Sequence, residues 1–142
     1  MSPLVKKAYE IAGEAHAGQV DKAGADYILH PMTVASNVGD DENAVIVALL
    51  HDVCEDTDVT IGELAEVFPQ PVIEALRAMT HDKDTPYMEY VAQVKKNPIA
   101  RVVKIADMEH NMDLSRIPNP SQKDLERLEK KYKPAYEFIT ED

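Results

Sequence analysis

The stretch from Ala48 to Thr57, which reads A-L-L-H-D-V-C-E-D-T, places the tightest constraint on this chain. An apolar run leads directly into four ionisable residues, which are His51, Asp52, Glu55 and Asp56. In a helix these four side chains fall within an arc of roughly 140°, since each residue turns by about 100°. Three carboxylates and an imidazole on one arc resist burial unless a cation lies between them. The stretch therefore predicts a cation site at the end of a buried helix; the alternative is a frayed, solvated helix end that carries ordinary acids.

The composition limits the partners of this site. With 142 residues and 44% hydrophobic residues, the chain is expected to form one domain with a real core. Its formal net charge is −11, and an acidic surface repels nucleic acid polymers and anionic membranes, so we expect neither as a partner. No apolar run approaches the length of a membrane span, and the N-terminus lacks the apolar core of a signal peptide. Together with a single cysteine, Cys54, these features predict a cytoplasmic protein in which Cys54 is a packed core thiol.

Helical periodicity runs through most of the chain, and it predicts an all-α fold. The sequence has no sustained alternation of apolar and polar residues and no Asn-Gly or Asp-Gly hairpin turn. Proline, serine and threonine mark the helix starts. The helices are expected at about 2–18, 31–38, 41–55, 60–68, 71–79, 86–94, 98–112 and 121–140, with a kink at Pro134 in the last of them. A polar loop is expected over residues 18–27.

Two further segments carry polar residues beside apolar runs. His30 stands directly before a proline, and that position is pushed out of helical geometry, so we expect His30 at the boundary just before a helix. The helix that starts at residue 98 carries Lys104, Asp107 and Asn111 within about 60° of one another. The alternative for this group is a plain ion pair between Lys104 and Asp107, with Asn111 at the helix end.

These segments together supply two imidazoles and two carboxylates, from His30, His51, Asp52 and Asp107. That mixture suits one divalent transition ion, such as Mn²⁺, Fe²⁺ or Zn²⁺, better than Ca²⁺. A water on such an ion is acidified and can attack as hydroxide. Glu55 lies one helical turn from His51 and can orient this water or take its proton, and Asp56 can act beside it. We interpret His16 and His81 as helix-end residues rather than metal ligands.

The same residues resemble a known family. The segments A-H-A-G-Q-x-x-K-A-G-x-x-Y-I-L-H-P, A-L-L-H-D-V-C-E-D-T and K-I-A-D-M-E-H-N-M look like the (p)ppGpp hydrolase domain of RelA/SpoT proteins and the stand-alone small alarmone hydrolases. These are HD-domain metal-dependent phosphohydrolases. The resemblance covers roughly residues 4–117. It implies a compact helical bundle of the HD type over residues 1–142, with a C-terminal helix at about 121–140, and no synthetase domain in this chain.

The resemblance also implies roles for single residues. It makes His30, His51, Asp52 and Asp107 the ligands of one ion, usually Mn²⁺ in the family. Glu55 and Asp56 match the catalytic pair that positions the attacking water. The substrate-binding residues that it implies line the nucleotide side of the pocket or belong to the K-x-A-D segment, and these are Lys22, Tyr27, Asn111 and Lys104.

Two positions depart from the family pattern. Asp21 stands where the alarmone hydrolases usually carry an arginine that stacks on the guanine base, and Met108 stands where they have an arginine after the metal-binding aspartate. The change at Asp21 removes a stacking and cation–π surface and adds a charge that repels phosphate. The predicted metal ligands are unaffected by these two departures, whereas the nucleobase that the protein prefers is left open.

The sequence therefore predicts a metal-dependent phosphohydrolase that acts on a small phosphorylated substrate, a nucleotide such as ppGpp, and removes its 3′-pyrophosphate. One alternative is a phosphatase of the HD type for another nucleotide or a small phosphoester. A second alternative is a nucleotide-binding HD module without turnover. Glu55 and Asp56 argue against the second, since such carboxylate clusters are frequently functional. The sequence leaves the oligomeric state open.

Overall fold

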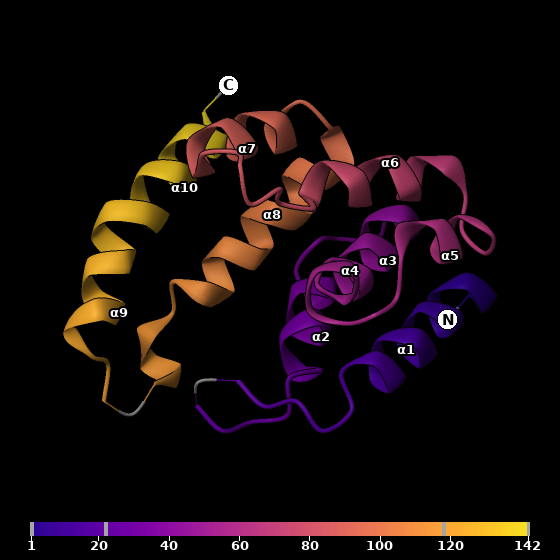
Figure 1. The fold of residues 1–142 in the computed structure, drawn as a ribbon, viewed down its shortest axis with the longest axis horizontal. Helices are drawn as coiled ribbons and strands as arrows, with labels where there is room; N and C mark the ends of the chain where they lie inside the picture. The colour runs from indigo at the N-terminus through magenta and orange to yellow at the C-terminus, as the bar shows by residue number, and fades with distance from the viewer. Residues whose placement is uncertain (1, 22, 118, 142) are drawn as a thin grey trace.

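The computed structural model describes residues 2–21, 23–117 and 119–141, and it confirms the all-α fold (Figure 1). In chain order the elements are α1 (Pro3–Ala15), α2 (Leu29–Ser36), α3 (Glu42–Leu50), α4 (Val53–Asp56), α5 (Ile61–Ala65), α6 (Gln70–Met79), α7 (Tyr87–Lys95), α8 (Pro98–Asn111), the 3₁₀ turn η1 (Leu114–Arg116), α9 (Gln122–Arg127), the π-helical segment η2 (Leu128–Tyr132) and α10 (Lys133–Thr140). Among the described residues, β pairing is limited to one isolated bridge between Val20 and Asp26. None of the described helices is long and apolar enough to cross a membrane.

Helix α3 forms the centre of the core. It packs against α1, α2, α6 and α8, and most of its side chains are completely buried. A helix that is apolar on all sides is stable only inside a protein, which explains this position. The completely buried residues of α3 are Ile46, Val47, Ala48, Leu49 and Leu50. The polar residues that follow Leu50 are therefore delivered into the interior.

The expected continuous helix over 41–55 is wrong, because the chain breaks between α3 and α4 at His51 and Asp52. The His51 imidazole donates a hydrogen bond from Nδ1 to the Ala48 carbonyl oxygen at 2.6 Å. A side chain thus satisfies a carbonyl of the last turn, which is one way in which helices end. The break points both side chains toward the same region of the core.

The expected position of His30 is also wrong. Helix α2 begins at Leu29, so His30 lies within its first turn rather than before it. Pro31 is compatible with this start, because the first N–H groups of a helix have no partner in the helix and a proline there loses little. His30 is buried by the packing of α2 on α3 and α8.

The C-terminal arm consists of α9, η2 and α10 and lies across α8 from the N-terminal helices (Figure 1). Its predicted start is confirmed, since Ser121 and Asp124 form a reciprocal capping box. The irregularity expected at Pro134 takes the form of the π-helical segment Leu128–Tyr132, just before the proline. Proline has no N–H to donate to the preceding turn, which favours such a local adjustment.

Truncation of a core residue of α3 tests the central position of this helix. We expect Leu49→Ala to lower the free energy of unfolding by about 2–5 kcal/mol, because Leu49 is completely buried and its loss leaves a cavity. Urea denaturation in the presence of a metal chelator measures this value without a contribution from bound metal. The control is Val102→Ala on α8, where the side chain is 44% exposed and a change within about 0.5 kcal/mol is expected. Equal losses in both variants would contradict the assignment of α3 as the core helix.

Candidate metal centre

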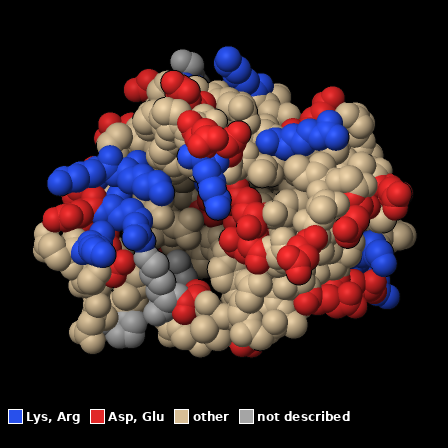
Figure 2. Space-filling view, viewed as in Figure 1, with Lys and Arg blue, Asp and Glu red and all other residues tan. Residues whose placement is uncertain are grey.

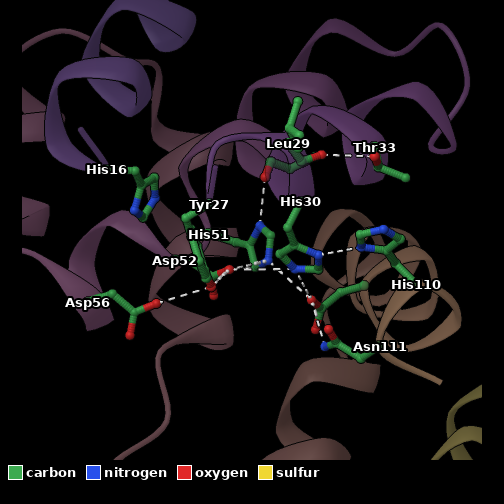
Figure 3. Close-up of polar contacts among 12 residues, drawn as sticks. His16, Tyr27, Leu29, His30, Thr33, His51, Asp52, Asp56, His110 and Asn111 are labelled. Carbon is green, nitrogen blue, oxygen red and sulfur yellow. Dashed lines mark hydrogen bonds and ion pairs between the residues drawn. The ribbon is translucent and has the colours of Figure 1, made fainter. Parts of the chain in front are cut away.

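The structure brings together the four residues predicted as metal ligands, although they come from three separate segments (Figure 3). His30 comes from α2, His51 and Asp52 from the break between α3 and α4, and Asp107 from α8. Each offers one ligand atom, and these atoms all lie within 4.8 Å of one another. We name this group the HHDD cluster.

The individual distances show how tightly the HHDD cluster is drawn together. Asp107 Oδ1 lies 2.8 Å from His30 Nε2 and 3.3 Å from His51 Nε2. Asp52 Oδ2 lies 3.1 Å from His51 Nε2 and 3.6 Å from His30 Nε2. His30, His51 and Asp107 are each less than 10% exposed, at 7%, 5% and 4%. Two histidines and two carboxylates that share so small a buried volume match the donor set of a divalent metal ion.

The second nitrogen of each imidazole has its own partner. His51 Nδ1 is the donor to Ala48, so Nδ1 carries a proton and Nε2 faces the cluster. His30 Nδ1 lies 2.6 Å from Nδ1 of His110, and the two rings stack with centroids 4.8 Å apart. Outer partners of this kind fix the orientation of metal-binding histidines. The structure therefore preorients both Nε2 atoms.

His110 was missed by the sequence analysis, although it lies inside the quoted segment K-I-A-D-M-E-H-N-M. It stands three residues after Asp107 on α8, a spacing that places both side chains on one face of the helix. That spacing was the available signal. Its partner His30 is 80 residues away in the sequence, and no local pattern shows that contact.

Charge compensation surrounds Asp107. Burial alone would raise the pKa of Asp107, but the Lys104 ammonium and the hydrogen bonds with His30 and His51 outweigh it, and they hold this pKa well below its usual range. Lys104 Nζ donates to Asp107 Oδ2 at 3.0 Å, and Asn111 Nδ2 donates to Oδ1 at 3.3 Å. The ion pair that the spacing allowed is thus present. Asp107 is an anion at neutral pH, ready to pair with a cation.

Tyr27 and Asp56 lie on one side of the HHDD cluster (Figure 3). The Tyr27 hydroxyl donates to Asp52 Oδ2 at 2.8 Å and lies 3.3 Å from Asp56 Oδ2. Burial, and then the charge of Asp52, raise the pKa of Tyr27, so the phenol stays protonated and serves as a donor. Burial and the charge of Asp52 also raise the pKa of the Asp56 carboxyl.

Glu55 lies on α4, one residue before Asp56, and it contacts a different part of the chain. Its Oε1 accepts a hydrogen bond from the backbone N–H of His81 at 2.7 Å. Partial burial raises the pKa of Glu55, and the His81 N–H partly opposes this shift. Cys54 is not part of the HHDD cluster, and burial raises the pKa of its thiol to about 11, in agreement with the predicted packed thiol.

Two cavities flank the HHDD cluster. The larger has a volume of about 300 Å³ and lies between the loop that contains Asp21 and Tyr27 and the arm residues Asp124 and Arg127. The smaller, of about 160 Å³, is lined by Glu55, Lys104, Asp107 and Lys131, among others. Asn111 and Tyr132 line both. Figure 2 shows a hollow near the middle of this face, with acidic side chains on one side and basic side chains on the other.

The structure describes three of the four predicted substrate-binding residues. Tyr27 and Asn111 line the larger cavity, and Lys104 lines the smaller one. Lys22 lies outside the described residues. Asp21 lines the larger cavity and also holds its own loop, because its Oδ1 accepts from the N–H groups of Ala23 and Ala25 at 2.9 and 3.0 Å.

Comparison with known proteins identifies the family. A family model described as an HD domain matches residues 8–127. The chain belongs to the HD-domain family. It is 30% identical over 131 residues to a probable GTP pyrophosphokinase of Mycobacterium leprae, which covers 84% of this chain and 17% of the relative. It is 32% identical over 119 residues to the guanosine-3′,5′-bis(diphosphate) 3′-pyrophosphohydrolase of Aquifex aeolicus, which covers 76% of this chain and 17% of the relative. The bifunctional (p)ppGpp synthase/hydrolase SpoT of Escherichia coli is 30% identical over 122 residues, which cover 76% of this chain and 17% of SpoT.

This HD domain therefore spans about 17% of the length of these curated relatives. A solved structure of a metazoan ortholog of SpoT has the same fold, with a TM-score of 0.71 and 23% sequence identity. The match covers 98% of this chain and 94% of that chain. The names of the curated relatives agree with the resemblance that the sequence motifs predicted, and the solved structure agrees with the fold.

Removal of single members of the HHDD cluster tests the metal site. We expect His51→Ala and Asp107→Ala each to lose most bound divalent metal, because each removes one of four convergent donors. Elemental analysis after loading with Mn²⁺ and removal of free ion measures the content, with circular dichroism as a check on the fold. The control is Asp58→Asn, which changes an exposed carboxylate outside the cluster and should leave the metal content unchanged. Full metal occupancy in both cluster variants would overturn the assignment.

Proposed function

We propose that this HD domain is a metal-dependent phosphohydrolase that removes the 3′-pyrophosphate of guanosine 3′,5′-bis(diphosphate), with GDP and pyrophosphate as products. The observation that carries this proposal is the convergence of four donor atoms beside two further carboxylates, between two cavities. The relative from Aquifex aeolicus, which is named for this reaction, supports the choice of substrate. A cytoplasmic location and the absence of a nucleic acid polymer as partner stay predictions.

The proposed metal ligands are the members of the HHDD cluster, with Mn²⁺ as the proposed ion and Fe²⁺ or Zn²⁺ as alternatives. The residues fit such an ion, since two preoriented imidazole nitrogens and two carboxylates are suitable donors. When bound, a divalent ion supplies Lewis acidity, which polarises a phosphoryl oxygen and activates water. The surrounding residues then orient the water and the substrate.

Glu55 is the proposed general base. Its carboxylate lines the smaller cavity, near Lys104 and Asp107, and the hydrogen bond from His81 holds one of its oxygens. A carboxylate whose pKa is raised by partial burial is a better proton acceptor than an ordinary glutamate. Asp56 is proposed to assist from the other side of α4, where Tyr27 orients it.

The two cavities suggest how a nucleotide binds. We assign phosphate groups to the smaller cavity, where Lys104 and Lys131 supply positive charge, and the nucleoside to the larger one. Tyr27 and Asn111 lie at the junction with the HHDD cluster, and Lys22, outside the described residues, stays a predicted substrate-binding residue. This division gives an acidic protein a local region that accepts an anion.

A second candidate function is a phosphatase for another nucleotide or a small phosphoester. The observation in its favour is the presence of Asp21 and Asp124 on the larger cavity, where carboxylates offer no stacking surface for a base. Met108, the other departure from the family pattern, is buried and lines the smaller cavity. A nucleotide-binding module without turnover is the least supported alternative, because the chain carries both Glu55 and Asp56, the proposed catalytic pair.

Release of pyrophosphate from guanosine 3′,5′-bis(diphosphate) in the presence of Mn²⁺ tests the proposal directly. We expect Glu55→Gln to keep the fold and the metal but to lose about 10²–10⁴-fold in kcat, because the amide cannot accept a proton. The matched control is Glu63→Gln, which makes the same change at an exposed position on α5.

Three results discriminate among the readings. Turnover of other nucleotides but not of this one in a substrate panel favours the second candidate. Absence of turnover on the whole panel favours a binding module. If Glu55→Gln reacts at the wild-type rate, another residue is the general base, and Asp56 is the first one to examine.

The charge at Asp21 is expected to set base selectivity. Asp21→Arg adds a planar cation that can stack on guanine, so we expect KM for guanosine 3′,5′-bis(diphosphate) to fall about three- to thirty-fold with kcat little changed. Because Asp21 also accepts two backbone hydrogen bonds, Asp21→Asn is the matched control: it removes the charge and keeps an acceptor. Asp21→Asn should lower KM less than Asp21→Arg does. An unchanged KM in both variants would show that Asp21 does not face the base.

A further inference from the structure

The loop between α6 and α7 touches the proposed general base from outside the sequence motifs. The backbone N–H of His81 donates to Glu55 Oε1 at 2.7 Å, across 26 residues of sequence. This bond joins the start of the loop to α4. A hydrogen bond from a backbone N–H to a carboxylate is charge-assisted and stronger than one between neutral groups.

His81 directly follows Thr80, the C-cap of α6, and lies outside the HHDD cluster, as predicted, but its ring is also held on two sides. Its Nε2 donates to the Thr85 carbonyl oxygen at 2.7 Å and closes the loop on itself. Its face stacks on Tyr90 of α7, with ring centroids 4.4 Å apart and 21° between the planes. Tyr90 is only 4% exposed, and its hydroxyl donates to the Met79 carbonyl oxygen at 2.5 Å. The ring is therefore anchored to a buried residue, and the direction of the His81 N–H is fixed with it.

Glu55 needs such an anchor. Its side chain is among the exposed ones, and a glutamate at the surface samples many rotamers. A general base works only when its oxygen stays within hydrogen-bond reach of the proton that it takes. With Oε1 held by His81, Oε2 is the oxygen that can face the water. His81 also lines the smaller cavity, but its Nε2 is engaged with the Thr85 carbonyl oxygen.

We propose that His81 is a positioning residue for the phosphohydrolase reaction, which holds the Glu55 carboxylate beside the HHDD cluster through its backbone N–H and its anchored ring. This inference rests on the proposed function, since it assigns Glu55 as the base. It goes beyond the motifs, because neither His81 nor Tyr90 belongs to the segments that resemble the family.

Two substitutions distinguish the contribution of the His81 backbone N–H from that of the His81 ring. His81→Ala keeps the N–H and removes the anchor, whereas His81→Pro removes both. The preceding residue, Thr80, has φ −78° and ψ 117°, which suits a residue before proline. We expect His81→Ala to lower kcat about three- to tenfold, and His81→Pro to lower it about a further ten- to hundredfold, with KM little changed. His81→Phe retains the stacking on Tyr90 and should restore part of the loss seen with alanine.

The decisive measurement is a double-mutant cycle with Glu55→Gln. Because His81 acts through Glu55, His81→Ala and His81→Pro should cost much less in the Glu55→Gln background than in the wild type. The same loss in both backgrounds, or no loss in the wild type, overturns the inference. If His81→Pro does not fold, the alanine and phenylalanine variants complete the cycle. The control is Asp84→Asn, an exposed residue of the same loop, which should leave kcat unchanged.

Amide hydrogen exchange gives an answer that does not depend on turnover. The His81 amide should exchange slowly in the wild type and faster in Glu55→Ala, since that variant removes its acceptor. Unchanged protection in Glu55→Ala overturns the contact. Absence of turnover on any substrate, with the coupling of exchange intact, would instead overturn the proposed function and leave the link between Glu55 and His81 established.

Discussion

The buried charge of Asp107 is the interaction on which the rest of this structure depends. A carboxylate with 4% exposure is costly unless donors and cations surround it, and here they come from two helices and a helix break. Lys104 and Asn111 approach from its own helix, and the two histidines approach from α2 and from the end of α3. The packing of α2 and α8 on α3 is therefore coupled to the electrostatics of the site. A divalent cation would bind to side chains that the packing of these helices already holds together.

Much of the site could be predicted because local rules act on it. His51 and Asp52 follow the most apolar run in the chain, so burial of that run fixes where they go. Asp107 and Asn111 are one turn apart on a helix whose start is marked by Asn97 and Pro98. The start of the helix that carries His30 was wrong by two residues, because proline is tolerated throughout the first turn of a helix and not only at its first position.

The rest could not be predicted, because it depends on contacts between distant segments. The hydrogen bond from His81 to Glu55 and the stacking of His110 on His30 join residues that no periodic pattern relates. At the break between α3 and α4 a side chain takes a backbone carbonyl, in competition with the hydrogen bonds of a continuing helix. Which of these hydrogen bonds forms depends on tertiary contacts that exist only in the folded protein.

The π-helical segment Leu128–Tyr132 has a consequence for how this domain can diversify. The match to the HD family ends at residue 127, yet Lys131 and Tyr132 lie just beyond it and line the cavities beside the HHDD cluster. The residues assigned to bond cleavage come from the matched part, on α2, α4 and α8 and at the break between α3 and α4. Those that shape the far walls come from an arm whose winding is already irregular. Part of the cavity wall is thus carried by residues beyond the matched range, so this part of the arm can reshape the cavities while the residues assigned to bond cleavage stay constant.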